Sequence, residues 1–324
     1  MQSKILAATL LAAFAVTAAA AAHAAPKRPQ ITGISHIAIY TSSPALADYY
    51  YNVAVGAYEM PDPENLQGKR YFVSPTQFIE VLPLPADAGI SRLDHIAFNT
   101  TDVEGMRKYL AAKKYKVPAA VEKGADGSSW LTVLDPEGNK VQFVQLPAQP
   151  LKVDVSSAIG HHIIHAGMLV HDRATEDTFY RGLLGFKPYW WGGSKPGQTD
   201  WVSQQVPDGH DWLEYMLNNK PPASNAPAQP GRPANPRFAE RAAQQQLGVM
   251  NHFSIGEVSV PDAFNLLSRS NRLPVRMDSA PKIGLDGKYQ YNMYDPDGTR
   301  LELMNFHATD KPCCSPFTAD DPAE

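Results

Sequence analysis

Four segments of this chain repeat one another, and that repetition constrains the fold more than any other feature. Each segment is a short apolar stretch that begins with a histidine and ends in polar turn residues; the four histidines are His36, His95, His165 and His252. Apolar runs of this length between turn residues are typical of buried β-strands. A supersecondary unit that recurs four times in one chain indicates that neighbouring units share a core.

The segments that follow these strands complete the repeated unit. Helical spacing predicts one helix in each unit, over residues 44–51, 103–113, 175–184 and 261–268. Asp102 is the predicted N-cap of the second helix. Short strands follow every helix, and two units end in Asp-Pro-x-Gly turns at residues 135–138 and 295–298, which favour hairpins. The predicted unit is therefore βαβββ, and the predicted fold class is α+β with four tandem modules.

The repeats divide the chain into two halves. Modules one and two occupy residues 31–147, and modules three and four occupy residues 160–307. A linker at 148–159 joins the halves, and a tail follows at 308–324. A Pro-rich insertion at residues 218–246 interrupts the pattern, and it fits either a flexible connection or a lid over a cleft.

The first 24 residues have the features of a secretory signal peptide. Lys4 precedes an apolar, Ala-rich run, and residues 22–24 form an A-x-A cleavage signal. We therefore expect residues 1–24 to be removed and the mature protein to be periplasmic or secreted. No later run is long and apolar enough to predict a membrane span, so we expect no membrane association after cleavage.

Net charge limits the classes of binding partner, and cysteine content limits the possible disulfides. The formal net charge is −4 and no basic run stands out, so nucleic acid is a poor candidate partner. We expect a small-molecule substrate and a monomer or homodimer. The two cysteines, Cys313 and Cys314, are adjacent in the tail. Because a bond between neighbouring cysteines is strained, we expect no disulfide between them.

Three motifs in the C-terminal half carry a family resemblance. They are His165 followed by Val170 and Asp172, the helix end at residues 179–186, and Asp-Pro-Asp-Gly-x3-Glu at residues 295–302. In their order and repetition they resemble the vicinal oxygen chelate superfamily, which includes glyoxalase I, extradiol dioxygenases and bleomycin-resistance proteins. The resemblance implies that the modules form two domains, each an open eight-stranded barrel.

The resemblance also implies four metal-ligand positions in each half, on the first and last strands of the modules. The complete set is His165, Glu214, His252 and Glu302, and the second, weaker set is His36, Glu80, His95 and Gln142. Imidazole and carboxylate together suit a divalent Zn, Ni, Fe or Mn ion, whereas a neutral amide is a poorer ligand. The three glutamates lie inside apolar strands, where a carboxylate is costly unless it is paired or bound to metal.

The pairing of the modules stays open at this point. If module one pairs with two and module three with four, each set forms one site. If module one pairs with four, His36 and Glu80 would instead join His252 and Glu302. Both arrangements place His252 and Glu302 in the complete site.

The leading functional hypothesis is a metal-dependent lyase or isomerase that resembles glyoxalase I. The metal would hold two adjacent substrate oxygens, and Glu302 or Glu214 would be the catalytic base. An exported protein meets little glutathione, so another 2-oxo or 2-hydroxy substrate is favoured.

Two alternatives remain. One is an extradiol-type dioxygenase with iron held by His165, His252 and Glu302. Against it, no histidine lies between His252 and Glu302, and Glu214 has no place in such a site. The other is a non-enzymatic small-molecule-binding protein that resembles the bleomycin-resistance branch. A cluster of four tryptophans could line its pocket: Trp190, Trp191, Trp201 and Trp212.

Overall fold

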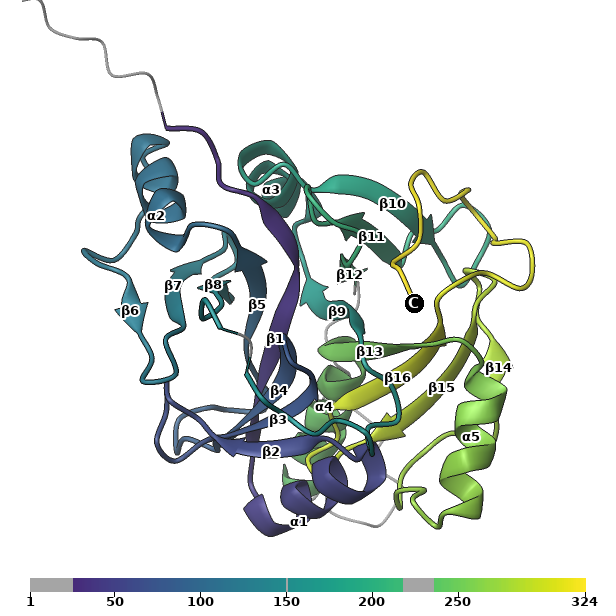
Figure 1. Ribbon diagram of the computed structural model, residues 1–324. Coiled ribbons are helices and arrows are strands. Elements are labelled where there is room, and N and C mark those ends of the chain that lie inside the picture. The colour runs from purple at the N-terminus through teal and green to yellow at the C-terminus, as the bar shows by residue number, and fades with distance from the viewer. Residues whose placement is uncertain (1–25, 150, 218–235) are drawn as a thin grey trace, which may run out of the picture.

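The computed structural model describes residues 26–149, 151–217 and 236–324 of the chain. It contains two eight-stranded half-barrel sheets, one in each half. Figure 1 shows the N-terminal half, in purple to blue, beside the C-terminal half, in teal to yellow. The predicted α+β class is confirmed. The predicted signal peptide, residues 1–24, lies outside the described residues.

The N-terminal half consists of two βαβββ modules. Its elements are β1 (Ile31–Thr41), α1 (Pro44–Tyr49), the π-helical turn η1 (Tyr50–Val55), β2 (Tyr58–Pro61), β3 (Lys69–Ser74), β4 (Gln77–Pro83), β5 (Leu93–Thr100), α2 (Val103–Ala112), β6 (Glu122–Lys123), β7 (Ser129–Leu134) and β8 (Lys140–Gln145). The strand order is β2-β3-β4-β1-β5-β8-β7-β6. The antiparallel pairing of β1 with β5 joins the modules, so His36 and His95 lie at the centre of the sheet.

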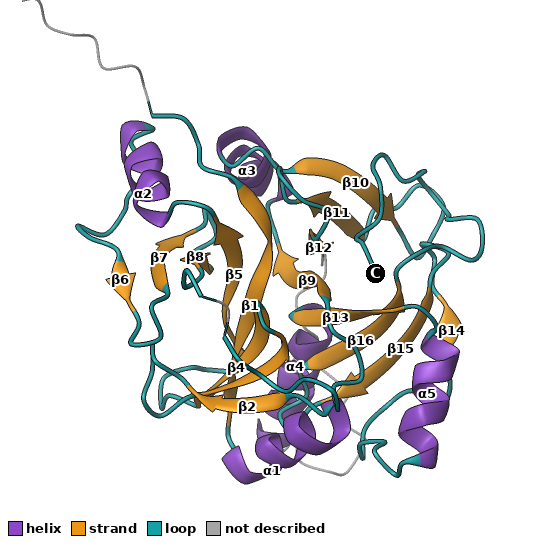
Figure 2. Cartoon of the chain, in the orientation of Figure 1, coloured by secondary structure: helices purple, strands orange, loops and turns teal. Residues whose placement is uncertain are grey.

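The C-terminal half repeats this plan. Its elements are β9 (Ile163–Val170), α3 (Arg173–Asp177), the π-helical turn η2 (Thr178–Leu183), β10 (Lys187–Gly192), β11 (Trp201–Gln205), β12 (Trp212–Leu217), α4 (Pro236–Met250), β13 (His252–Glu257), α5 (Val260–Arg269), β14 (Lys282–Ile283), β15 (Tyr289–Tyr294) and β16 (Arg300–Asn305). The strand order is β10-β11-β12-β9-β13-β16-β15-β14. Figure 2 shows the strands gathered in the two sheets, with α1, α2, α3 and α5 outside them.

Local sequence signals explain where these elements begin and turn. The Asp102 side chain accepts a hydrogen bond from the Gly105 N–H at 2.8 Å, which confirms it as the N-cap of α2. Gly138 and Gly298 have φ values of 88° and 94° in the two Asp-Pro-x-Gly turns. Glycine adopts this left-handed conformation without steric cost. The predicted helices are present, but two of them continue as π-helical turns, which helical spacing does not reveal.

The two halves pack through a second pairing of modules. Tyr51 of module one donates to Asp295 of module four at 3.2 Å, and Tyr180 of module three donates to Asp135 of module two at 3.4 Å. Buried apolar residues of both halves form one core cluster. Within the sheets, module one pairs with two and module three with four. Between the sheets, the two tyrosine contacts join one with four and two with three, and further hydrogen bonds join one with three. Ligand residues on strands therefore meet only within their own half.

The tail and the insertion differ from expectation. The expectation that the adjacent cysteines stay unbridged was wrong, because Cys313 and Cys314 form a disulfide. Cys314 has a φ of 71°, and Ser315 N–H donates to the Cys313 carbonyl at 2.8 Å; this tight turn brings the two sulfur atoms together. Of the insertion, residues 218–235 lie outside the described residues, and the rest belongs to α4. No helix in the described ranges is long and apolar enough to cross a membrane.

Candidate metal centres

The sheet register places the candidate ligands of the N-terminal half on one face. Ala38, two residues after His36 on β1, is flanked by Glu80 of β4 and by His95 of β5. Gln142 lies on β8, the next strand after β5. Side chains two residues apart on a strand point to the same side. The small side chain of Ala38 therefore leaves room for the larger ones around it.

The C-terminal half has the same arrangement. Gly167, two residues after His165 on β9, is flanked by Glu214 of β12 and His252 of β13. Glu302 of β16 lies on the far side of β13. A Cβ atom on Gly167 would lie only 2.0 Å from Cε1 of His252. The glycine is therefore required for the His252 ring to lie where it does.

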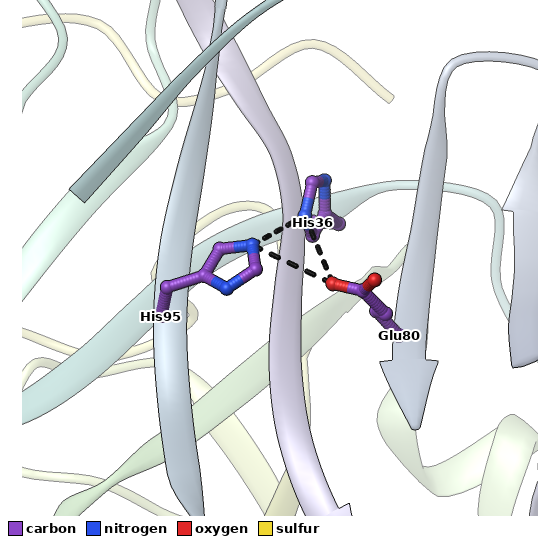
Figure 3. Close-up of side chains that lie close together, drawn as sticks. All are labelled: His36, Glu80 and His95. Atoms are coloured by element: carbon purple, nitrogen blue, oxygen red, sulfur yellow. Dashed lines mark hydrogen bonds and ion pairs between the residues drawn. The ribbon is translucent and has the colours of Figure 1, made fainter. Parts of the chain in front are cut away.

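In the N-terminal half, three side chains converge, as Figure 3 shows. The Nε2 atoms of His36 and His95 are 2.9 Å apart, and they lie 3.6 and 3.5 Å from Oε2 of Glu80. All three side chains are buried. They form one of two groups in the described chain that could hold a metal ion.

In the C-terminal half, the second such group is His165, His252 and Glu302. The Nε2 atoms of the two histidines are 3.1 Å apart, and Oε2 of Glu302 lies 3.4 Å from Nε2 of His165. Glu214 is close as well, with Oε2 at 3.4 Å from Nε2 of His252. The structure thus brings together all four residues of the set that the sequence predicts as complete.

These separations fit a bound ion. Ligand atoms that bind one ion at about 2.1 Å, with angles between 90° and 110°, are about 3.0–3.5 Å from one another. The separations of 3.1 and 3.4 Å in the C-terminal group fall in that range, and those of 2.9, 3.5 and 3.6 Å in the N-terminal group lie in it or close to its limits. In the N-terminal group, Oε2 of Glu80 is buried and has no hydrogen-bond partner among the described residues. A buried carboxylate oxygen without a partner is costly, and a cation between the three side chains would remove that cost.

The histidine rings are held so that Nε2 faces the centre of each group. Nδ1 of His95 is 2.7 Å from Oδ2 of Asp94, and Nδ1 of His252 is 2.9 Å from the Met250 carbonyl. A carbonyl oxygen only accepts, so Nδ1 of His252 carries the proton and Nε2 presents a lone pair. Stacking fixes the other two rings, with His36 on Phe78 and His165 on Trp212. The imidazoles are thus oriented as metal ligands require.

Burial sets the charge of these groups. It lowers the pKa of His165 and His252 well below the usual value, so both rings are neutral. Burial also raises the pKa of Glu302 to about 7, although Arg300 opposes the rise. In the other half, burial lowers the pKa of His36 and raises that of Glu80. Neutral imidazoles are the form that binds metal.

The two halves take their carboxylate from different strands. Glu80 occupies in the first sheet the place of Glu214 in the second, and Gln142 occupies the place of Glu302. The Gln142 amide donates to Oε1 of Glu64 at 2.6 Å, while its own oxygen is buried without a partner among the described residues. The sequence prediction contained Glu80 as the one carboxylate of the first set, and the structure brings it together with His36 and His95.

The residue that lies opposite the first glutamate in the sheet register differs between the two halves. Arg70 lies beside Glu80 on β3, pairs with Asp62 at 3.0 Å and Asp126 at 3.3 Å, and stacks over the Phe78 ring. The sequence does not reveal this residue, because nothing in the β3 pattern links it to the site. In the C-terminal half the equivalent position is Ser203.

The C-terminal group opens onto a pocket of about 320 Å³. Glu214 and Glu302 line it together with Trp190, Trp201 and Arg300. Of the other tryptophans, Trp212 stacks on His165, and Trp191 is exposed outside the pocket lining. No residue of α4 lines this pocket in the described part of the chain, so the lid interpretation of the insertion gains no support from residues 236–250.

A larger cavity of about 710 Å³ lies between the halves and contains neither group. His162, Asp211 and Glu257 line it, and Nε2 of His162 is 2.8 Å from Oδ1 of Asp211. Asp211 also accepts the Ile34 N–H at 2.8 Å. The hydrogen bond from Ile34 to Asp211 joins the halves, and the cavity holds neither metal-ligand group, so the smaller C-terminal pocket is the better candidate for chemistry.

Comparisons with known proteins agree with this architecture. Residues 162–303 match the model of the Glyoxalase/Bleomycin resistance protein/Dioxygenase superfamily. No curated protein matches the chain. Similar solved structures include a catechol 2,3-dioxygenase, with 16% identity, a TM-score of 0.57 and coverage of 91% of this chain and 96% of that chain.

Two further structures give the same picture. The 2,3-dioxygenase LapB from Pseudomonas sp. KL28 has 12% identity, a TM-score of 0.60 and coverage of 90% of this chain and 97% of that chain. A variant of homoprotocatechuate 2,3-dioxygenase from Brevibacterium fuscum has 16% identity, a TM-score of 0.61 and coverage of 91% and 75%. At these identities the likeness shows the fold.

Proposed function

Because this chain belongs to the vicinal oxygen chelate superfamily, we propose that its C-terminal pocket is a metal-dependent site for ring cleavage of the extradiol dioxygenase type. The substrate is a small aromatic compound that binds through two adjacent oxygen atoms. The observation that carries the proposal is the group of two histidines and one glutamate, His165, His252 and Glu302, beside an aromatic-walled pocket. This ligand set is typical of non-haem iron oxygenases.

The group's ligand chemistry defines the role of the ion. An iron(II) ion held by His165, His252 and Glu302 would supply Lewis acidity, open positions for two substrate oxygens and reactivity with dioxygen. The three side chains lie on neighbouring strands of one sheet, a rigid support that fixes their separations.

Residues around the pocket bind and orient the substrate. Trp190 and Trp201 form aromatic walls against which a flat ring packs and from which water is excluded. Glu214 lines the same pocket, with its side chain 14% exposed, and it can accept a proton from a substrate hydroxyl. Among the described lining residues there is no histidine or tyrosine, and the carboxylates outside the metal-ligand group are Glu214 and Asp286. Glu214 is 3.4 Å from Nε2 of His252, so we assign it the role of base.

A lyase or isomerase reaction of the glyoxalase I type is the second candidate. Glu214 favours this candidate, because its Oε2 lies 3.4 Å from Nε2 of His252 and could be a fourth metal ligand. A ring-cleaving site of the two-histidine, one-carboxylate type needs three protein ligands. Two carboxylates around one ion allow one to stay bound while the other moves a proton. If residues 1–24 direct export, as the sequence predicts, glutathione conjugates are poor substrates for this reaction.

The test compares metal and reaction together. Metal-free protein is loaded anaerobically with iron(II), or in parallel with nickel or zinc, and each form is offered catechol, 3,4-dihydroxybenzoate and a 2-hydroxy acid. Oxygen uptake with the iron form and a ring-opened product would support the first proposal. Solvent deuterium exchange at the hydroxy acid without oxygen uptake would overturn it in favour of the second. Tight binding without turnover in any form would favour a binding protein instead.

A further inference from the structure

Strand β8 of the N-terminal half and strand β16 of the C-terminal half each begin with a cationic residue, but the surroundings of the two cations differ. In the N-terminal half this residue is Lys140, which lies opposite His95 in the register and pairs with Asp94 at 2.7 Å. Asp94 also accepts a hydrogen bond from His95 at 2.7 Å. The positive charge of Lys140 is therefore neutralised within the protein.

In the C-terminal half the equivalent cation is Arg300, which lies opposite His252. The residue before His252 is Asn251, and its side-chain oxygen accepts the Leu169 N–H at 3.0 Å. No carboxylate replaces Asp94 there. The one ion pair recorded for Arg300 among the described residues is to Oε1 of Glu302, at 3.9 Å.

Arg300 is nevertheless almost buried. Its side chain is 13% exposed, and its Nε has no hydrogen-bond partner in the described part of the chain. A guanidinium group with unmet donors at low exposure is costly unless an anion pairs with it. Glu302 compensates it poorly, because its other oxygen belongs to the metal-ligand group. The other cation of the pocket, Lys282, already pairs with Asp278 at 3.1 Å.

Arg300 lies where a bound substrate would meet it. Arg300, Glu302 and Met304 alternate along β16 and line the same pocket. Residues two apart on a strand are about 7 Å apart, which is the scale of a substituted aromatic ring. A ring whose adjacent oxygens lie at the Glu302 level therefore extends its opposite substituent toward Arg300.

On the basis of the function proposed above, we propose that Arg300 binds a carboxylate of the substrate, so that the pocket selects an aromatic acid with two adjacent oxygens over its neutral analogue. The planar guanidinium can donate two parallel hydrogen bonds to a carboxylate, which lysine cannot reproduce. Trp190 and Trp201 hold the ring between the two anchoring points.

The test uses zinc-loaded protein, in which binding is measured without turnover. Quenching of tryptophan fluorescence gives dissociation constants for 3,4-dihydroxybenzoate and for catechol. The wild type should bind the acid at least about tenfold more tightly, a factor in line with one charge-assisted pair. Arg300→Gln should reduce the ratio to about one with zinc content unchanged, and Arg300→Lys should give an intermediate ratio. Lys140→Gln, the matched change in the other half, should leave the ratio unaltered.

The outcomes separate the inference from the function on which it rests. Equal binding of both compounds by the wild type, or an unchanged ratio in Arg300→Gln, would refute the carboxylate subsite alone. Loss of zinc in Arg300→Gln would show instead that Arg300 positions Glu302, and would also refute it. Failure of both compounds to bind the wild type would contradict the proposed function and the inference together.

Discussion

Replacing Glu302 with glutamine should change stability in opposite directions with and without metal. Glu302 is 3% exposed, and burial raises its pKa to about 7. Because the folded-state pKa is raised, the folded protein holds this proton more tightly than the unfolded chain does. Stability is therefore greatest below the ordinary carboxyl pKa and is lost as the pH rises toward 7.

The size of the effect follows from that shift. A rise from 4.5 to about 7 corresponds to a cost of about 3 kcal/mol for the ionised carboxylate above pH 7. Glutamine has nearly the same shape and no charge, and it loses about 1 kcal/mol of hydrogen bonding. At pH 8 in chelator, Glu302→Gln should therefore be about 2 kcal/mol more stable than the wild type. At pH 5 the two should differ little.

With metal the order should reverse. An ion at 1,000 times its dissociation constant stabilises the folded state by about 4 kcal/mol. Glu302→Gln removes a charged ligand, so its affinity for the ion should fall by orders of magnitude and most of this stabilisation should be lost. Urea unfolding at pH 8, with and without chelator, measures both effects. Gln142→Ala, at the equivalent place in the other sheet, is the control and should keep the metal-dependent stabilisation of the C-terminal site.

A Glu302→Gln protein that loses the same stability in chelator and in metal would refute the reasoning, because Glu302 would then be a structural residue only. Unchanged affinity for zinc would have the same meaning.

Three further predictions concern the histidine ligands of the two groups and a buried glutamate of β13. His165→Ala should abolish metal binding and turnover at the C-terminal pocket while His36→Ala spares both, because each sheet contains its own group; equal effects would contradict this. Protein dialysed against excess zinc should hold two ions per chain, and His95→Ala one, as measured by elemental analysis; one ion in both would show that the N-terminal group binds none. Burial raises the pKa of Glu257 to about 8, so Glu257→Gln should raise the melting temperature more at pH 9 than at pH 5, and a pH-independent effect would be evidence against it.

The sequence predicts the modules well because their signals are local. The histidine-led strands, the cap at Asp102 and the turns at Gly138 and Gly298 depend on residues within a few positions of one another. The equivalence of Glu302 and Gln142 also follows from their places after matching turns. These features therefore appear in the structure as the repeat predicts.

Other features depend on neighbours that the sequence does not pair. The N-terminal group takes Glu80, whereas the C-terminal one takes Glu302, and strand pattern alone does not decide between them. The cross-contacts of Tyr51 with Asp295 and of Tyr180 with Asp135 join distant modules. Module one also bonds to module three, so the sequence alone does not show which modules meet across the core.

The difference between the halves indicates how one fold supports two kinds of site. At the position next to the first carboxylate, the N-terminal half has Arg70, which is 5% exposed on its side chain and forms ion pairs with Asp62 and Asp126. The C-terminal half has the much smaller Ser203 there, and Glu214 beside it faces a pocket.

The cationic residue at the start of the last strand of each sheet, Lys140 on β8 and Arg300 on β16, also differs in its partners. Lys140 is neutralised by Asp94, whereas Arg300 lies in the pocket opposite His252, and the residue before His252 is Asn251 instead of an aspartate. The change from Arg70 to Ser203 leaves space beside the carboxylate of the C-terminal half. The change from Asp94 to Asn251 leaves the positive charge of Arg300 without a matching aspartate. The N-terminal group is thus enclosed by ion pairs of its own half. The C-terminal group keeps the space and the positive charge that an anionic substrate would need.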